Sequence, residues 1–591
     1  MRLSIAQPRE AAQPVDQSAA RLVAWTTALG GALYGFLGAG WQSIVESAQV
    51  LARTVQYNVQ DIEYHYLIKI PVLQNHIAAL LLWLGGNEVL VCRVASGVTT
   101  ALMFEAWGLF AFGLSRSAML GMGAPFLVMA SLAGLRGLDY AINFPPIDYG
   151  YGPLTLILIG LVAAYLAVGW ERAAGFTAGL LPATHPIVGV WGVGVVFALL
   201  VLEVWQTRRV PWRFTIWLAF GLVLSAIDLG GYILIYYRDI PIFDNSSRNF
   251  VFAFSHLHDD HRARFGPSLT LVSIAVSAVT AAAYGWAERQ RLEPGQQRAL
   301  VLLALNAFFG TMATSVYWWP QNLIPLALFS AMPNRFLNVN ALMFAPLVLG
   351  ALGALGTRRH APWLGAGFVA LLALDAVFVG GGLLVRGTIA TLALDAAALA
   401  LLAILVSRRI VASLDRLPGE RLVTPVVALG LAAGLAVVAA DAVELWRSSD
   451  ERFVNYANDA ALAAAHRGQG DLLFYKDPMH NVGAQAWTRR PLVIDPNIIS
   501  AIPYMGEEGA VMMPVLHDLY GINLLSPDPS CNEYSSPCVA ALWQRRTPQD
   551  WAKLAAQYRF DEILVPARIT LELPLVAESA RFRLYRVAGA S

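Results

Sequence analysis

Charged residues are scarce in this chain of 591 residues. Asp, Glu, Lys and Arg make up 14% of it, whereas a soluble domain has about a quarter. Hydrophobic residues make up 57%, and apolar runs of about 18 residues or more recur, each long enough to cross a bilayer. A net charge of +1 gives no reason to expect nucleic acid as a partner. We therefore predict a polytopic α-helical membrane protein that lies in the lipid bilayer.

Other common signals are also absent. The sequence contains no internal repeat, no low-complexity tract and no glycine-rich fingerprint of a soluble nucleotide site. The first twenty residues lack the apolar core and the small-residue cleavage site of a removable signal peptide. We expect the first apolar segment to remain in the membrane as an anchor.

About thirteen apolar segments are expected to cross the membrane. They are 22–41, 89–113, 117–134, 152–170, 174–185, 187–205, 214–236, 267–287, 299–319, 337–356, 363–385, 388–407 and 423–443. The segment 174–185 is short, and we separate it from the next one at Thr184-His185-Pro186. Fusing the two would place the arginines around Arg208 on the outer face and invert everything that follows.

Arginine placement predicts the orientation. With a cytoplasmic N-terminus, the inner loops hold Arg116, Arg172, Arg208, Arg209, Arg213, Arg289, Arg291, Arg298, Arg358, Arg359, Arg408, Arg409 and Arg416. An excess of Lys and Arg on the cytoplasmic side is the usual pattern. We predict a multi-pass protein of the bacterial inner (plasma) membrane whose C-terminal region is periplasmic or extracytoplasmic.

The composition changes near Arg447, so we divide the chain into a membrane domain, 1–446, and a soluble α/β domain, 447–591. Short apolar runs at 471–475, 491–495, 562–566 and 582–587 predict strands, and 451–466 and 549–558 predict helices. Cys531 and Cys538 predict a disulfide on the oxidising side of the membrane. Cys92 lies within a span and is expected to serve only packing.

The first outer loop, 42–88, is dense in ionisable and aromatic groups. It contains Asp61, Glu63, Tyr64, His65 and Lys69. A carboxylate at the membrane surface can accept a proton from a hydroxyl group or ligate a hard cation, and a lysine can meet a phosphate as a point charge. The alternative is a solvated loop whose charges only keep it out of lipid.

The second outer loop, 136–154, repeats the combination of acids and aromatic rings. Asp139, Asp148 and Tyr149 lie here. Aromatic rings can stack on the C–H faces of sugars while carboxylates bind the hydroxyls. Tyrosine is also enriched at any membrane interface, so an ordinary interfacial loop is the alternative.

The third outer loop carries a histidine-rich motif. His256, His258, Asp260 and His261 form the pattern H-x-H-x-D-H, and imidazole with carboxylate can bind a transition metal. The zinc-hydrolase fold that uses this pattern works from soluble strands and is excluded between two membrane spans. A solvated loop is the alternative to a divalent metal site.

Two arginines near the outer face are candidates for binding an anionic head group. Arg262 follows the histidine-rich motif, and Arg335 stands in the fourth outer loop beside an apolar stretch. An arginine at this depth binds a phosphate or extends to the lipid head groups.

These features together resemble the GT-C superfamily of polyprenyl-phosphate-sugar-dependent membrane glycosyltransferases, which includes protein O-mannosyltransferases, aminoarabinose transferases and arabinofuranosyltransferases. The resemblance rests on D-I-E-Y-H-Y at 61–66, on the hairpin G-F-T-A-G-L-L-P-A-T-H-P at 175–186, and on the C-terminal runs L-L-F-Y, R-R-P-L-V-I-D and Y-R-F-D-E-I-L-V-P. Nearly the whole chain takes part in it as architecture.

The resemblance implies inverting transfer of a sugar from a polyprenyl-phosphate donor to a cell-envelope glycan, lipid or protein. Asp61 would be the base, Asp148 or Asp139 an auxiliary acid, and Lys69 and Arg335 holders of the donor phosphate. A D-I-E sequence stands where a clean acid pair is usual, so the need for a metal stays open.

Two other functions stay open. A lipid or sugar transporter or flippase would place ionisable groups at mid-membrane depth on broken helices; Asp228, Asp375 and Asp395 lie within spans, but no basic partner is evident at similar depth. An O-antigen-type polymerase or ligase usually has one large outer loop in mid-chain instead of a folded C-terminal domain.

Overall fold

The structure is a computed structural model. It describes residues 15–41, 43–58, 61–68, 70, 72–132, 135, 151–236, 245–258, 262, 269–356, 362–379, 388–406, 420–475, 483–495, 506–526, 528 and 537–587.

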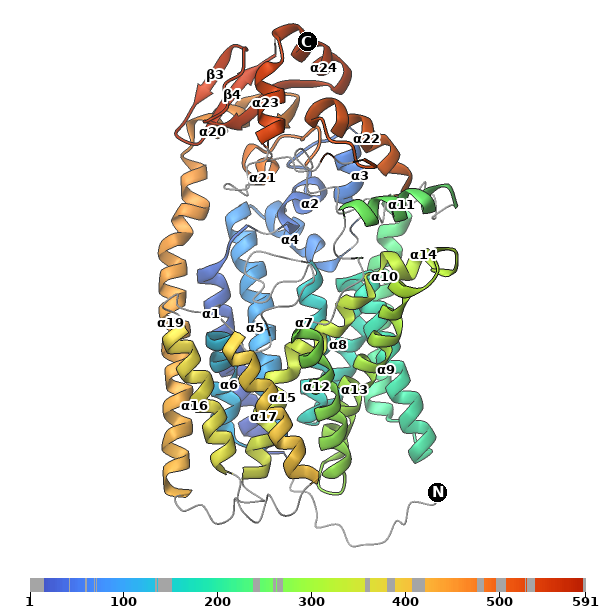
Figure 1. Ribbon diagram of the computed structural model, residues 1–591, viewed down its shortest axis with the longest axis vertical. Helices are drawn as coiled ribbons and strands as arrows, with labels where there is room; N and C mark the ends of the chain where they lie inside the picture. Colours follow the sequence, from blue (N-terminus) through green and yellow to red (C-terminus); the bar gives the residue numbers. More distant parts are fainter. Residues whose placement is uncertain are drawn as a thin grey trace.

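Most of the chain forms a bundle of long helices (Figure 1). These are α1 (Gln17–Gly38), α5 (Glu88–Ser115), α6 (Ala118–Ser131), α7 (Tyr151–Ala167), α8 (Glu171–Thr184), α9 (Pro186–Thr207), α10 (Trp212–Tyr236), α12 (Leu269–Ala287), α13 (Pro294–Thr314), α15 (Asn338–Gly356), α16 (Pro362–Val379), α17 (Thr388–Val406) and α19 (Glu420–Ala457). Shorter elements between them are α2 (Ile44–Leu51), α3 (Ile62–Ile68), α4 (Leu73–Trp83), α11 (Asn245–His258), η2 (Ser315–Trp318), η3 (Gln321–Leu323), α14 (Leu326–Ser330) and η4 (Pro333–Leu337).

Each predicted apolar segment coincides with one of the long helices, but fewer of them qualify as spans than the predicted number of about thirteen. Within the described ranges, eight helices are long and apolar enough to cross a membrane, or nine if the pair α3 and α4, bent by 105°, counts as one span. The helices α6 and α8 have 14 residues each, fewer than the roughly 20 needed to cross the hydrocarbon core.

Several of the turns predicted to be cytoplasmic lie together where the structure describes them. Arg298 at the start of α13 donates to Glu171 and Glu203, at 2.6 Å in each case. Glu171 is the first residue of α8 and Glu203 lies near the last residue of α9, so the two helices form a hairpin that turns at His185. Arg116 pairs with Glu293 at 3.2 Å in the same region. The separation of α8 from α9 in the sequence is therefore confirmed.

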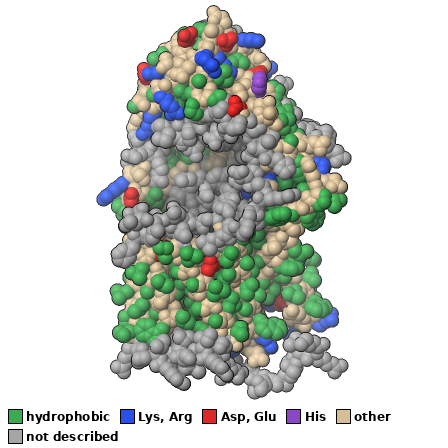
Figure 2. Space-filling model, viewed as in Figure 1, with side chains coloured by type: hydrophobic (Ala, Val, Ile, Leu, Met, Phe, Trp, Pro, Cys, Tyr) green, Lys and Arg blue, Asp and Glu red, His purple; other side chains and the backbone are tan. Residues whose placement is uncertain are grey.

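The surface of the bundle is apolar. Large side chains such as Trp25, Leu234 and Val406 are exposed by 77%, 79% and 87%, which suits contact with lipid. Figure 2 shows hydrophobic side chains covering the helical part of this face, whereas charged side chains gather on the C-terminal part.

Helices α8 and α10 pack with their backbones in close contact, and glycine makes this approach possible. A Cβ atom added to Gly179 would lie 2.4 Å from the carbonyl oxygen of Leu218, and one added to Gly221 would lie 2.5 Å from that of Phe176. Small residues at helix contacts are typical of membrane bundles.

The C-terminal part caps one end of the bundle (Figure 1). It contains α20 (Ala460–Arg467), β1 (Asp471–Phe474), α21 (Ala484–Thr488), α22 (Gly506–Tyr520), α23 (Pro537–Arg545), α24 (Pro548–Tyr558), β2 (Phe560–Pro566), β3 (Leu575–Glu578) and β4 (Phe582–Arg586). The sheet order is β1-β2-β4-β3; β1 and β2 are parallel, and β4 is antiparallel to both β2 and β3. Large buried rings, among them Trp543 and Trp551, fill the core on one side of the sheet.

Three of the four predicted strands are present, and the prediction of the fourth, at 491–495, is wrong. The run 491–495 forms one bridge, between Leu472 and Leu492, and no strand. Asp495 in this run instead donates its backbone N–H to a side chain of the first loop. Strand β3 was not predicted, because its exposed residues show no apolar alternation.

Candidate active site between the membrane helices and the C-terminal part

The first outer loop folds into α2, α3 and α4, which lie between the bundle and the C-terminal part (Figure 1). Ile62 and Tyr66 of α3 pack against the C-terminal core around Leu516 and Ile563. Because α3 packs on the C-terminal part, we treat it as lying outside the membrane. The loop that the sequence analysis favours is thus enclosed by two parts of the chain.

Asp61 begins α3. Its Oδ2 accepts the backbone N–H of Asn58 at 2.7 Å, and its carbonyl oxygen accepts the backbone N–H of His65. Burial raises the pKa of the Asp61 carboxyl, while the Asn58 hydrogen bond and the charges of Arg559 and His65 oppose this rise. A carboxylate with a raised pKa is a better proton acceptor than an ordinary aspartate.

A second acid from the C-terminal part lies near Asp61. Asp471 is the first residue of β1, and burial, together with the negative charge of Asp61, raises its pKa to about 7. Arg490 and Arg559 lower it in part. Asp471 was not among the predicted site residues. It is the first residue of a predicted strand, but nothing in the local sequence shows that this end of the strand faces the first loop.

Glu63 is enclosed by the protein. It is 1% exposed, and its Oε2 accepts the backbone N–H of Asp495 at 2.9 Å. Burial and the charge of Asp495 raise the pKa of Glu63 well above its usual value. A side chain buried in this way joins the loop to the C-terminal part.

The aromatic residues of α3 form a small cluster. Tyr64 packs beside Val50, Leu67 and Ile68, and its ring centroid lies 6.5 Å from that of Tyr57 and 6.2 Å from that of His65. The aromatic run that suggested sugar binding therefore also supports the local fold.

Several predicted site residues lie outside the described residues: Lys69, Asp139, Asp148, Tyr149, Asp260, His261 and Cys531. His256 and His258 belong to α11. In the part of the chain that the structure describes, no group of three or more His, Cys, Asp or Glu side chains could hold a metal ion. The disulfide between Cys531 and Cys538 stays a prediction; Cys92 is buried in α5.

The two candidate arginines differ in their surroundings. Arg262 is 4% exposed, and its Nη2 donates to the carbonyl oxygen of Ser330 at 3.0 Å. Arg335, in η4, is half-buried and lies near His185, the residue at the turn of the α8–α9 hairpin; burial and the charge of Arg335 lower the pKa of His185 to about 4. Arg335 therefore places positive charge at the outer end of the bundle.

Helix α4 is hydrogen-bonded to two other helices, α10 and α8. His76 Nδ1 lies 2.8 Å from Asp228 Oδ1 in α10, and Gln74 donates to the carbonyl oxygen of Thr184 at 2.9 Å. The expectation that Asp228 lacks a basic partner is wrong. Its partner comes from the first outer loop, far away in the sequence.

No family model matches the sequence, and no curated protein matches it. Solved structures do. The chain is similar to ArnT. The structure of ArnT from Cupriavidus metallidurans bound to undecaprenyl phosphate matches over 97% of this chain and 98% of that one, with 15% identity and a TM-score of 0.45. The apo state of the same protein matches over 96% of each chain, with 15% identity and a TM-score of 0.39.

The arrangement around Asp61 suits proton transfer. The carboxylate is partly exposed, its pKa is raised, and Asp471 and Arg559 lie close enough to influence charge in the same space. The negative charge of Asp61 contributes to the raised pKa of Asp471, so the two carboxyls influence each other's protonation.

Proposed function

We propose that this protein is an inverting integral-membrane glycosyltransferase that moves a hexose or pentose from a polyprenyl-phosphate donor to a cell-envelope acceptor. The observation that carries the proposal is Asp61, a carboxylate with a raised pKa held where the membrane helices meet the C-terminal part. The resemblance of D-I-E-Y-H-Y and of the α8–α9 hairpin to GT-C enzymes supports the same function.

The reaction follows from the placement of this base. An acceptor hydroxyl oxygen attacks the anomeric carbon from the face opposite the phosphate, and Asp61 takes the hydroxyl proton. The bond between the anomeric carbon and the phosphate oxygen breaks, and polyprenyl phosphate leaves. Arg335 and Lys69 stabilise the phosphate that develops negative charge, and Asp148 or Asp139 assists from the second outer loop.

The membrane topology belongs to the same proposal. The N-terminus is cytoplasmic, the long helices cross the inner membrane, and residues 447–591 form a periplasmic domain that helps to bind the acceptor. The Cys531–Cys538 disulfide fits that compartment. A lipid-bound donor is consistent with a sequence that has no soluble nucleotide fingerprint.

The test is release of polyprenyl phosphate from a labelled pool of polyprenyl-phosphate sugars. Purified protein in detergent is mixed with crude cell-envelope acceptor, and the lipid products are separated. Release together with labelled acceptor supports the proposal. Donors that stay intact across the whole pool, combined with movement of the labelled lipid across vesicles that contain the protein, would establish transport instead.

A further inference from the structure

Two short segments lie against each other beside Asp61. One is the first-loop segment 49–63, and the other is the C-terminal segment 485–495. Hydrogen bonds join them at three places, through Gln49, Tyr57 and Glu63. Asp61 lies between the second and third places in the sequence, so these bonds flank it.

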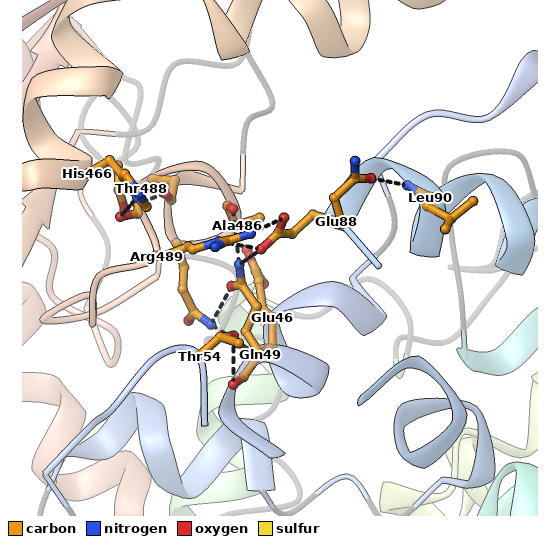
Figure 3. Close-up of polar contacts among 12 residues, drawn as sticks. Glu46, Gln49, Thr54, Glu88, Leu90, His466, Ala486, Thr488 and Arg489 are labelled. Atoms are coloured by element: carbon orange, nitrogen blue, oxygen red, sulfur yellow. Dashed lines mark hydrogen bonds and ion pairs between the residues drawn. The ribbon is translucent and has the colours of Figure 1, made fainter. Parts of the chain in front are cut away.

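The first place is a polar network at the start of α5 (Figure 3). Gln49, which is fully buried, donates to Glu88 Oε1 at 2.9 Å and to the carbonyl oxygen of Ala486 at 3.0 Å. Arg489 donates to both oxygens of Glu88, at 2.8 and 3.0 Å. A bidentate arginine–carboxylate pair fixes orientation as well as distance, so this network anchors the C-terminal segment to a membrane helix.

The second place is the hydroxyl of Tyr57. It donates to Gln485 Oε1 at 2.6 Å and accepts the backbone N–H of Leu492 at 3.1 Å. Gln485 in turn donates to the carbonyl oxygen of Glu46 at 3.0 Å and to Gln49 Oε1 at 3.2 Å. One tyrosine hydroxyl therefore connects the first loop to two positions of the C-terminal segment, Gln485 and Leu492. Through Gln485 it is also connected to the polar network around Gln49.

The third place is Glu63, which lies two residues after Asp61 in the sequence. Its carboxylate accepts the backbone N–H of Asp495. The carboxylate of Asp61 itself is bonded to Asn58, within the loop. The orientation of Asp61 thus follows from the position of the loop, and the loop is held from the C-terminal part. Groups that orient a reactive side chain in this way commonly affect activity as strongly as the direct contacts do.

We propose that Tyr57 and Gln485 are positioning residues, through which the C-terminal part holds Asp61 in its reactive orientation. This inference rests on the proposed function for its catalytic consequence. It assigns the C-terminal part a role in catalysis in addition to acceptor binding. Loss of the Tyr57 hydroxyl should leave donor binding intact and slow the chemical step.

The test compares Tyr57→Phe with Tyr558→Phe. The second variant is the matched control, because Tyr558 donates to Asp518 at 2.6 Å elsewhere in the C-terminal part. Hydrogen–deuterium exchange of residues 52–63 is measured for both variants, together with kcat and the donor KM. Since one hydrogen bond contributes about 1 kcal/mol, we expect kcat of Tyr57→Phe to fall about 5- to 10-fold with unchanged KM, and exchange in 52–63 to rise; the control should show neither change.

A third variant, Gln485→Ala, is combined with Tyr57→Phe. If the two residues act through one bond, the double variant should lose little more kcat than either single variant. Unchanged exchange in 52–63 for Tyr57→Phe would overturn the inference, as would raised exchange with a wild-type kcat. If the wild-type protein releases no polyprenyl phosphate, the proposed function fails and the catalytic inference with it, while the exchange data still decide whether Tyr57 and Gln485 hold the loop.

Discussion

The strongest expected effect on stability comes from Arg490, whose side chain is 4% exposed. It pairs with the equally buried carboxylate of Glu562 and donates to the carbonyl oxygens of Gln469 at 2.6 Å and Gly470 at 3.0 Å. The substitution Arg490→Met keeps an unbranched side chain in place of the aliphatic part of arginine and removes the guanidinium group, with its charge and donors. The buried carboxylate of Glu562 would then keep one charged partner, Arg586. This arginine contacts Glu562 at 3.0 Å, and its own side chain is largely exposed.

Breaking a buried ion pair by removing one partner costs about 3–5 kcal/mol. Arg586 remains as a partner, so we take the lower end, about 3 kcal/mol, which corresponds to a Tm lower by roughly 10 °C for a domain of this size. The assay is thermal unfolding of the C-terminal part in detergent, followed by limited proteolysis. The control is Arg583→Met, since Arg583 pairs with Glu578 at the surface and exposed pairs contribute little. Equal Tm values for the two variants would refute the reasoning.

Three further predictions concern charge. The pKa of Asp471 in the folded protein is raised to about 7, so the wild type should lose stability as pH rises from about 4 to 7. The expected loss is about 1–2 kcal/mol after allowance for solvent screening, and Asp471→Asn should remove it. Tm values of both proteins at pH 5 and pH 8 check this. The pKa of Glu63 is also raised, so Glu63→Gln, which keeps an acceptor for the Asp495 N–H, should have a higher Tm than the wild type at pH 8 and an equal Tm at pH 4. Arg335→Ala should lower kcat/KM for the donor about 10- to 100-fold and Arg335→Lys should lower it less; equal values for both variants and the wild type would remove Arg335 from the phosphate site.

The helices could be predicted from the sequence because each depends on a local apolar run. The division at Thr184-His185-Pro186 was correct, since Pro186 suits the first residue of a helix and His185 provides the cap of α9. The number of spans was less well predicted, because an apolar run shows that a segment is hydrophobic and does not show whether it crosses the whole bilayer.

The candidate site could be predicted only in part. The first loop was identified from its density of acids and rings, and Asp61 lies at the edge of the enclosed region as a base would. Its neighbour Asp471 and the pairing of His76 with Asp228 depend on contacts between distant parts of the chain, which local patterns do not reveal. The sequence favoured Asp61 over Glu63 as the base, and it did not show that Glu63 is buried against the C-terminal segment.

The most direct test of the central claim compares Asp61→Asn with Glu63→Gln in the polyprenyl-phosphate release assay. Both substitutions replace a carboxyl group by an amide of similar size that keeps an acceptor oxygen, at Asp61 directly before α3 and at Glu63 within it. If Asp61 is the base, Asp61→Asn should lower release at least about 100-fold, whereas Glu63→Gln should stay within a few-fold of the wild type. Wild-type release by Asp61→Asn, or equal loss in both variants with intact folding, would contradict the assignment of Asp61.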